Sequence, residues 1–422
     1  MSNQIGSLKM GQKMKKTPAG EIPVDWGVAT IADLCQVNPE VIKESTQPDM
    51  QLKYIDIASI ERTGSISIPK DMEFKDAPSR ARRIVKAGDI IVSTVRPYLR
   101  AFARITDLSE NLVASTGFAV LRARPNVNGG YVYQHVLSDS FVKYLEEKMT
   151  GSSYPAVNSS DVAEYQMPVP SAVEQEKISV MLSGVDTLIN KSSAEIKKSR
   201  ELKRGLMRQL LTCGIGHKKF KVTPRGPIPT VWEVMPIKAL AEAMLNGGTP
   251  DTTNKLYWSG TIPWISGADF SNQKVDAFRR HITPEAVKNS ATNIIPKGAL
   301  LVVTRTGVGK LAIAPVDITI SQDITGIIPK AALISTEFMF RMLNLFIGKL
   351  KANHQGTSIN GILREDLESF LLPVPPLPEQ REITGILIGC DDLLNKQDQS
   401  LTKLIILKKS LMNMLLTGKV RV

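Results

Sequence analysis

Apolar positions follow two different spacings along this chain of 422 residues. In two long stretches they recur at alternating intervals of four and three residues, the heptad spacing of helices that pair with one another. Elsewhere, short β-branched and apolar runs alternate with turns, which is typical of strands in small sheets. The pattern therefore predicts an α+β protein whose globular α/β units are separated by two long helices.

The heptad seams lie in predicted spacer helices at 171–212 and 376–418. The seven seam positions of the first helix are Ile178, Leu182, Val185, Ile189, Ser192, Ile196 and Ser199. Those of the second helix are Ile383, Leu387, Cys390, Leu394, Gln397, Leu401 and Leu404. We expect the pairing to be carried by Ile178, Leu182, Ile189, Ile196, Ile383, Leu387, Leu394 and Leu401. Each helix would extend over roughly 40 residues, or about 60 Å.

An exposed apolar stripe of this length is unfavourable in water, so the two helices are expected to pair within the chain. They would form an antiparallel intramolecular coiled coil with pseudo-two-fold symmetry, which amounts to a homodimer built into one chain. The alternative is that each helix packs only on its own globular unit.

The second spacer helix and the segment before it repeat the first at a constant offset of 205 residues. This offset carries Gly151 to Gly356 and Glu174 to Glu379, and both copies contain a proline-rich hinge, MPVPSAVEQ and LPVPPLPEQ. A long repeat in two copies indicates two copies of one structural unit.

Two globular units are predicted, at 17–170 and 229–375, with flexible residues 1–16 before the first and a linker at 213–228. Similar turns, TPAGEIPVDW and TPRGPIPTVW, lead into them, and their tryptophans should insert into the following domain. Each unit should contain a modest sheet. The predicted strands lie at 89–95, 117–121, 299–304 and 318–328, and the predicted helices at 131–149 and 336–351. Outside these landmarks the units differ, which suggests one scaffold that presents two surfaces.

Composition narrows the class of partner. The formal net charge is +12 and the pI is about 9.4, so a polyanion, either nucleic acid or an anionic membrane, is expected unless the protein is merely basic. Three distant cysteines give neither a disulfide framework nor a zinc motif, which fits a reducing cytoplasm. The N-terminus lacks a secretory signal and no run of 18 apolar residues occurs, so a membrane span is not expected.

Catalytic motifs are not found. The segment from Thr304 to Leu311 resembles a phosphate-binding loop but has Thr304 in place of the first glycine and Leu311 in place of the Ser/Thr. The Asn-Pro-Pro-aromatic motif of adenine methyltransferases is absent, and no metal-ligand cluster is evident. The chain is therefore interpreted as a non-catalytic binding protein without a cofactor or metal of its own.

Basic and polar turns at matching places in the two units are the candidate DNA contacts, because Arg, Ser, Thr and Asn can bind base edges or phosphates. These turns include 80–83 and 93–100 in the first unit, and 279–280 and 304–310 in the second. The residues assigned to DNA binding are Arg96, Tyr98, Arg100, Ser153, Asn158, Thr249, Arg305, Thr306, Lys310, Ser358 and Asn360.

Taken together and in order, several short motifs identify a family. They are the doubled TPxGxIPxxW turn, GGTP at 247–250, YWSGTIPW at 257–264, GTSINGI, PLPEQ and LLTGKV. With them, nearly the whole chain resembles the specificity subunit of type I restriction-modification systems. The first unit departs from the pattern because it lacks GGTP and the YW-G-IPW segment.

This resemblance implies a function. Each recognition domain would read one half of an asymmetric bipartite target in double-stranded DNA, and the paired helices would set the spacer between half-sites. Half-sites read from one face lie about 34 Å apart. Two modification subunits would dock and bring AdoMet, and restriction subunits would add chemistry driven by ATP and Mg²⁺. The alternatives are a self-contained DNA-modifying enzyme and a coiled-coil scaffold without a DNA role.

Overall fold

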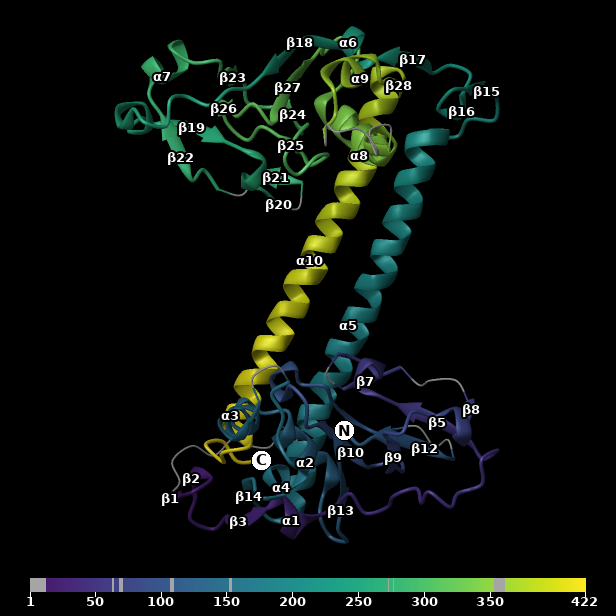
Figure 1. The fold of residues 1–422 in the computed structure, drawn as a ribbon, viewed down its shortest axis with the longest axis vertical. Coiled ribbons are helices and arrows are strands. Elements are labelled where there is room, and N and C mark those ends of the chain that lie inside the picture. Colours follow the sequence, from purple (N-terminus) through teal and green to yellow (C-terminus); the bar gives the residue numbers. More distant parts are fainter. Residues whose placement is uncertain are drawn as a thin grey trace, which may run out of the picture. The chain divides into compact units, whose positions relative to one another are not determined.

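A computed structural model describes residues 13–62, 64–67, 71–106, 110–151, 154–271, 273–275, 277–352 and 361–422. The chain forms two compact units: unit 1 contains residues 1–194 and 398–422, and unit 2 contains residues 195–397. The two long helices, α5 (Ala172–Cys213) and α10 (Leu377–Leu415), each contribute one half to each unit (Figure 1). The boundaries predicted between globular units and spacer helices stay predictions.

Unit 1 contains two four-stranded sheets. The first is antiparallel, in the order β11-β10-β13-β4, and the second has the order β8-β5-β12-β9 with β5 and β12 parallel. The strands are β4 (Cys35–Val37), β5 (Gln51–Ile55), β8 (Asp71–Glu73), β9 (Ala81–Ile84), β10 (Ile90–Ser93), β11 (Phe102–Arg104), β12 (Leu112–Ser115) and β13 (Phe118–Ala123). Three ribbons complete the unit: β1 (Met14–Thr17) with β2 (Gly20–Pro23), β3 (Gly27–Thr30) with β14 (Gln166–Val169), and β6 (Ile60–Arg62) with β7 (Ser65–Ile66).

Unit 2 repeats both sheets with the same strand order and the same directions, β25-β24-β27-β18 and β22-β19-β26-β23. The strands are β18 (Ala241–Asn246), β19 (Ile262–Ile265), β22 (Arg280–Ile282), β23 (Ile294–Ile295), β24 (Leu300–Val303), β25 (Leu311–Ile313), β26 (Ile318–Ile320) and β27 (Ile324–Pro329). The ribbons are β15 (Phe220–Thr223) with β16 (Gly226–Pro229), β17 (Glu233–Pro236) with β28 (Leu371–Val374), and β20 (Phe270–Ser271) with β21 (Lys274–Val275).

Apart from the long pair, the helices are short, with the exception of α8 (Thr336–Ala352) in unit 2, which has 17 residues. Unit 1 has α1 (Ile31–Leu34), α2 (Gly129–Val136), α3 (Asp139–Lys148) and α4 (Ser159–Ala163), with 3₁₀ turns η1 (Ile57–Ser59), η2 (Phe74–Asp76) and η3 (Pro97–Leu99). Unit 2 has α6 (Ile237–Leu240), α7 (Pro284–Lys288), α8 (Thr336–Ala352) and α9 (Arg364–Ser369), with η4 (Lys255–Trp258) and η5 (Gly267–Asp269). No described helix combines the length and the apolar composition that crossing a membrane requires.

Three sequence-based expectations need correction. The single helix predicted at 131–149 is two helices, because Ser138 accepts a hydrogen bond from the Phe141 amide and caps α3. The modest sheet expected in each unit is two four-stranded sheets. Residues 14–16 were expected to be flexible but pair with β2 as part of β1, whereas residues 1–12 lie outside the described part.

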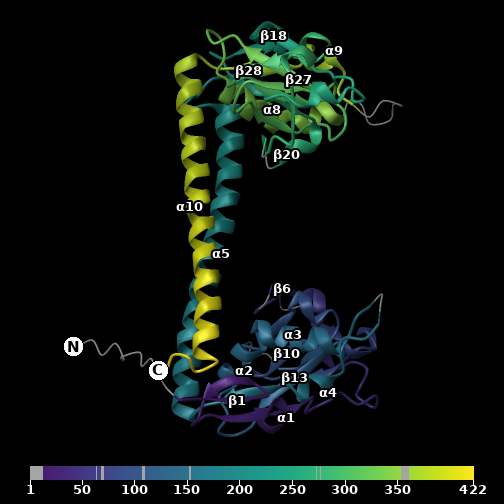
Figure 2. The same ribbon diagram turned by 90° about the vertical axis from the view of Figure 1, so that its left-hand side faces the viewer.

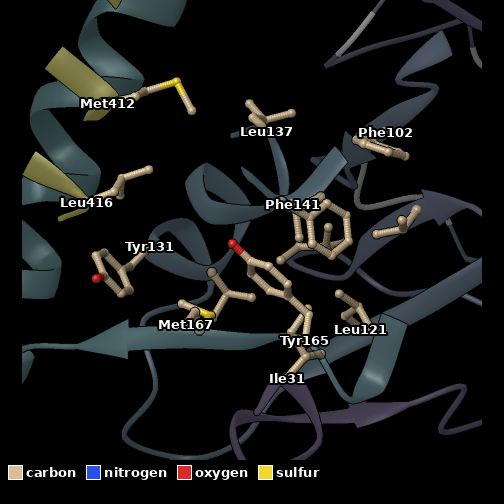
Figure 3. Packing of buried hydrophobic residues seen from close by; sticks show 14 of the residues in the cluster. Ile31, Phe102, Leu121, Tyr131, Leu137, Phe141, Tyr165, Met167, Met412 and Leu416 are labelled. Carbon is tan, nitrogen blue, oxygen red and sulfur yellow. The ribbon is translucent and has the colours of Figure 1, made fainter. Parts of the chain in front are cut away.

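Both long helices contribute to the hydrophobic core of each unit. In unit 1, Ile178 and Leu182 of α5 and Met412 and Leu415 of α10 join the cluster that covers the antiparallel sheet β11-β10-β13-β4. Figure 3 shows Met412 beside Leu137, and Leu416 above Tyr131 of α2. In unit 2 the other halves supply equivalent residues to the core, namely Leu210, Leu211, Ile383 and Leu387.

The helices run antiparallel within each unit, and both views show α5 and α10 side by side in unit 1 (Figures 1 and 2). In unit 1, Asp186 of α5 pairs with Lys408 of α10, while Glu174, earlier in α5, pairs with Arg421, after α10. In unit 2, Lys203 pairs with Asp391, and the Ile215 amide beyond α5 donates to Glu379 near the start of α10. An antiparallel coiled coil between two α/β units is the fold class that the sequence predicts.

Candidate nucleic-acid interface

A tryptophan is fixed at the same place in both units by the glutamate of the repeated hinge. Trp26 and Trp232 are almost fully buried. The indole of Trp26 donates to Glu174 Oε2 at 3.2 Å, and that of Trp232 donates to Glu379 Oε2 at 3.0 Å. The tryptophan of the lead-in turn is thereby joined to the beginning of the spacer helix, which holds each globular part on its helix.

The glutamine that follows each glutamate ties the same helix end to the domain. Gln175 donates to the Pro170 carbonyl at 3.0 Å, and Gln380 donates to the Pro375 carbonyl at 2.8 Å. Gln380 also accepts from the Ser335 amide at 2.9 Å, at the beginning of α8. The repeated Glu-Gln pair therefore has a structural role, because its hydrogen bonds attach the beginning of each long helix to the globular part of its unit.

Charge pairs fix the register of the two helices. The offset of 205 relates Asp186 to Asp391 and Lys203 to Lys408, and the two resulting ion pairs occur one in each unit. In unit 2 Arg341 of α8 adds a second cation 2.8 Å from Asp391. Burial opposes ionisation of Asp391, but hydrogen bonds from Lys203 and Arg341 outweigh it and keep the pKa of that carboxyl low.

Every predicted seam residue is buried or half-buried. Ile178, Leu182, Ile196, Ile383 and Leu387 are buried, and Ile189, Leu394 and Leu401 are half-buried. Ile178, Leu182, Ile383 and Leu387 also belong to the cores of the globular parts. The ends of each seam therefore serve both the helix pair and the domain.

In unit 2 the predicted loop 304–310 is anchored on the turn η5. Lys310 donates its ammonium to the carbonyls of Gly267 and Phe270, at 2.9 and 3.3 Å. A Cβ on Gly267 would lie 2.5 Å from the Thr306 carbonyl, so only glycine permits this approach. Arg305 and Thr306 are exposed, and the side chain of Arg305 has no ion pair or hydrogen bond among the described residues. Lys310 thus supports the loop, while Arg305 and Thr306 remain accessible.

Two arginines lie beside the same turn. Arg279 pairs with Asp269 at 2.5 Å. The guanidinium of Arg280 lies over the rings of Trp264 and Trp258, at 4.1 and 5.9 Å from their centroids. Arg279 and Arg280 come from the strand region of β22, so segments far apart in sequence form one basic surface around η5.

The two sequence signatures of the second unit have a packing role. A Cβ on Gly247 would lie 2.1 Å from the Ser321 carbonyl, and the Trp264 indole donates to the Gly248 carbonyl at 3.0 Å. The exposed Thr249 hydroxyl donates to the Gln322 amide oxygen at 2.5 Å. The GGTP and YWSGTIPW motifs therefore hold neighbouring segments of unit 2 close together.

In unit 1 the matching loop is arranged differently. Arg96 has a left-handed backbone, with φ of 48°, and its guanidinium lies 5.3 Å from the centroid of the Tyr154 ring. Tyr98 is exposed. Arg100 instead donates to the Leu137 carbonyl at 3.1 Å and pairs with Asp139 of α3. Tyr98 is accessible, whereas Arg96 and Arg100 are both half-buried and engaged within the domain.

The remaining predicted contacts come from the repeated GxS segment. The backbone amide of Asn158 donates to the Asp161 carboxylate at 2.6 Å at the beginning of α4, and Asn158 itself is exposed. Ser153, Ser358 and Asn360 lie outside the described residues. The repeated segment is hydrogen-bonded to the predicted DNA-contacting turn in both units. The Val157 amide donates to the Thr94 carbonyl in unit 1, and the Ile362 amide donates to the Thr304 carbonyl in unit 2. The segment therefore adjoins the predicted reading loops.

Arg100 also lines a cavity of about 520 Å³ in unit 1. Among the described residues, its lining includes two buried atoms without hydrogen-bond partners, Gln134 Oε1 and His135 Nε2. Burial lowers the pKa of His135 to about 3, so the imidazole is neutral. The cavity is suited to ordered water, which would satisfy both atoms.

Sequence reasoning missed Asp269, Glu174 and Glu379 as organising residues. The repeated Glu-Gln dipeptide was a visible signal for the glutamates, but their tryptophan partners are 148 and 147 residues away. Asp269 carried no sequence signal of its own.

Comparison with known proteins identifies the family. A model described as the type I restriction modification DNA specificity domain matches residues 23–198 and 229–403. The chain belongs to this family of DNA specificity domains.

Similar proteins extend over nearly the whole chain. The MjaX type I restriction enzyme specificity subunit of Methanocaldococcus jannaschii is 28% identical over 428 residues, covering 97% of each chain. A solved structure from work on assembly and conformational transition of the type I R-M system has a TM-score of 0.60 and 23% identity, covering 94% of this chain and 99% of that one. The type I S subunit from M. genitalium has a TM-score of 0.57 and 14% identity, covering 93% and 96%. These structures support the fold.

Proposed function

We propose that this chain gives a type I restriction-modification complex its DNA sequence specificity, with each unit reading one half of an asymmetric bipartite target. The observation that carries the proposal is the combination of identical sheet topology with different loop chemistry. Unit 2 presents Arg279, Arg305 and Thr306 around η5, whereas the matching loop of unit 1 presents Tyr98. Different readers on one scaffold suit two different half-sites.

The long helices are proposed to set the spacer and to dock two modification subunits. Three exposed apolar pairs repeat at the offset of 205: Met181 and Ile386 (41% and 39% exposed), Leu188 and Leu393 (54% and 53%), and Leu202 and Leu407 (72% and 48%). Exposed apolar residues on a helix favour a protein partner. Because the same positions recur in both units, two copies of one partner are expected.

The proposal places catalysis in the partners. The modification subunits would bring AdoMet and flip the target adenine, and restriction subunits would bring ATP- and Mg²⁺-dependent chemistry. This chain would have no cofactor, and a cytoplasmic location follows from its DNA partner. Neither a self-contained enzyme nor a scaffold without a DNA role is favoured, because the family is one of DNA specificity domains.

The decisive experiment exchanges one reading unit. The full chain, co-expressed with its modification subunits, is used to map methylated sequences across genomic DNA. Replacing residues 229–375 by the matching segment of a related chain should change one half of the target and leave the other half and the spacer unchanged. A change in both halves, or in neither, would contradict the proposal.

A further inference from the structure

Turns η1 and η5 occupy the same place in the two units but exchange their capping residues. Each turn follows the first strand of the parallel pair, β5 or β19. In unit 1 the amide and hydroxyl of Ser59 both donate to Asp56 Oδ1 at 2.9 Å. In unit 2 the amide and hydroxyl of Ser266 donate to Asp269 Oδ2, at 2.8 and 3.0 Å. A reciprocal capping box closes both turns, so the exchange does not serve the turn itself.

The exchange places the carboxylate of unit 2 at the end of the turn, where its second oxygen contacts Arg279. The side chain of Asp269 is only 1% exposed, and its Oδ1 accepts from Arg279 Nε at 2.5 Å. The side chain of Arg279 is 56% exposed. Among the described residues its two Nη groups have no hydrogen-bond or ion-pair partner. A buried acid therefore holds one edge of an otherwise accessible guanidinium.

The neighbouring arginine is held differently. Arg280 lies 4.1 Å from the centroid of Trp264 and donates to the Ser266 hydroxyl at 3.1 Å. Burial lowers the pKa of Arg280, consistent with a guanidinium partly enclosed by the two tryptophan rings. Arg280 therefore packs beside η5, and of these two arginines Arg279 is the one whose Nη groups have no partner among the described residues.

Arg279 also adjoins the loop 304–310 through the same turn. Lys310 is bonded to Gly267 and Phe270, and Gly267 approaches the Thr306 carbonyl, while Asp269 holds Arg279. The orientation of Arg279 is thus fixed relative to a loop that presents Arg305 and Thr306.

We propose that Arg279 reads a guanine in the half-site of unit 2 and that Asp269 is its positioning residue. The inference rests on the proposed function. With Nε bound to Asp269, the two Nη groups can donate in parallel to O6 and N7 of guanine in the major groove. Because Asp269 already holds the side chain at Nε, less conformational freedom is lost on binding.

The test uses two variants of the full chain in its complex with modification subunits. Arg279→Lys keeps the charge and removes the fork. The double variant Ser266→Asp with Asp269→Ser keeps a capping box, in the arrangement of unit 1, and removes the carboxylate beside Arg279. Asp56→Ser with Ser59→Asp makes the opposite exchange in unit 1 and is the matched control.

Methylation rates on duplexes with single base-pair changes in the mapped target give the result. Both unit 2 variants should lose discrimination at the same G·C pair, by about tenfold, with the other half-site unchanged. The unit 1 exchange should leave that base pair fully discriminated. An Arg279→Lys complex that discriminates as the wild type does, a unit 2 half-site without a G·C pair, or relaxation at different positions in the two variants would overturn the inference.

Failure of this inference can be told apart from failure of the proposed function. If exchange of residues 229–375 changes one half-site but Arg279→Lys changes none, only the role of Arg279 is wrong. If that exchange leaves the target unchanged, the modular function fails as well.

Discussion

The two units hold their buried tryptophans in the same way but close the site with different residues. In unit 1, Arg421 from the segment after α10 donates to Glu174 and Asp25 and lies 5.5 Å from the Trp26 ring centroid. In unit 2, His217 from the segment after α5 lies 2.8 Å from Glu379. One unit is closed by a permanent cation bound to two carboxylates, and the other by an imidazole bound to one.

The two units share one set of contacts and differ in another. The Trp–Glu bond, the Gln joint and the Asp–Lys pairs occur in both units, while the closing residue, the third partner of the Asp–Lys pair and the capping of η1 and η5 differ. The shared contacts join the long helices to the globular parts. The contacts that differ affect the stability of one unit or the residues that it presents to DNA.

The largest expected effect comes from a charge in the shared core. Leu182→Asp in unit 1 and Leu387→Asp in unit 2 should each lower the free energy of unfolding by about 4 kcal/mol or more, because a carboxylate would be buried without a partner. Chemical denaturation of the purified chain measures this. Similar losses are expected in the two units.

Leu188→Asp is the matched control for Leu182→Asp, because Leu188 is 54% exposed on the same helix. It should change the free energy of unfolding by no more than about 0.5 kcal/mol but weaken docking of a modification subunit, seen as altered stoichiometry by native mass spectrometry. A Leu182→Asp variant as stable as the control would place Leu182 outside the core in solution.

The two Asp–Lys pairs should differ in strength. Asp391→Asn leaves both Lys203 and Arg341 without their carboxylate, and the Arg341 side chain is only 10% exposed, whereas Asp186→Asn leaves Lys408 and the neutral Gln134. We expect a loss of about 2–3 kcal/mol for Asp391→Asn and about 1 kcal/mol for Asp186→Asn. Equal losses would mean that Arg341 contributes nothing to the pair.

The Asp391 contribution should also depend on pH. Its pKa is lowered in the folded protein, so the stabilisation is complete above the unfolded value of about 3.9 and disappears as the pH falls through the lower folded value. The difference between wild type and Asp391→Asn should therefore be constant from neutral pH to about pH 5 and shrink below about pH 4. Urea unfolding at a series of pH values measures it.

Effects no larger than those at the Asp–Lys pairs are expected at the closing residues. Arg421→Ala removes charged hydrogen bonds to two carboxylates and should cost about 1.5–3 kcal/mol, and His217→Ala about 1 kcal/mol. Hydrogen exchange of the Trp26 and Trp232 indole protons reports each site separately. Arg421→Lys, which keeps the charge, should recover part of the loss; acceleration at both indoles by one variant would show that the sites are not independent.

Much of the architecture was predictable because it rests on long, repeated patterns. The heptads from Ile178 and Ile383 gave the helix pair, and apolar runs such as Leu300–Val303 gave the central strands. The outer strands escaped because several have only two or three residues, too few to show a period. The division at Ser138 was hidden by apolar residues that continue the helical spacing across the cap.

The candidate site was predictable only in part. Arg305 and Thr306 are accessible where the turn pattern placed them, but the same reasoning could not separate them from Lys310 and Arg100, whose side chains bind carbonyls and a carboxylate within the domain. Residue type gives the capacity to bind DNA, while partners far along the chain decide whether that capacity is already used. The role of each residue in DNA binding stays a prediction.

The contribution of residues 398–422 to unit 1 has a consequence for biosynthesis. Met412, Leu415 and Leu416 complete the core of unit 1, and Arg421 closes over Trp26, yet the ribosome makes them only after all of unit 2. Nascent unit 1 must therefore wait, with part of its apolar surface uncovered, while some two hundred residues are added, on the order of ten seconds or more at typical elongation rates. A premature stop after residue 397 would damage the unit made first and spare the one made last.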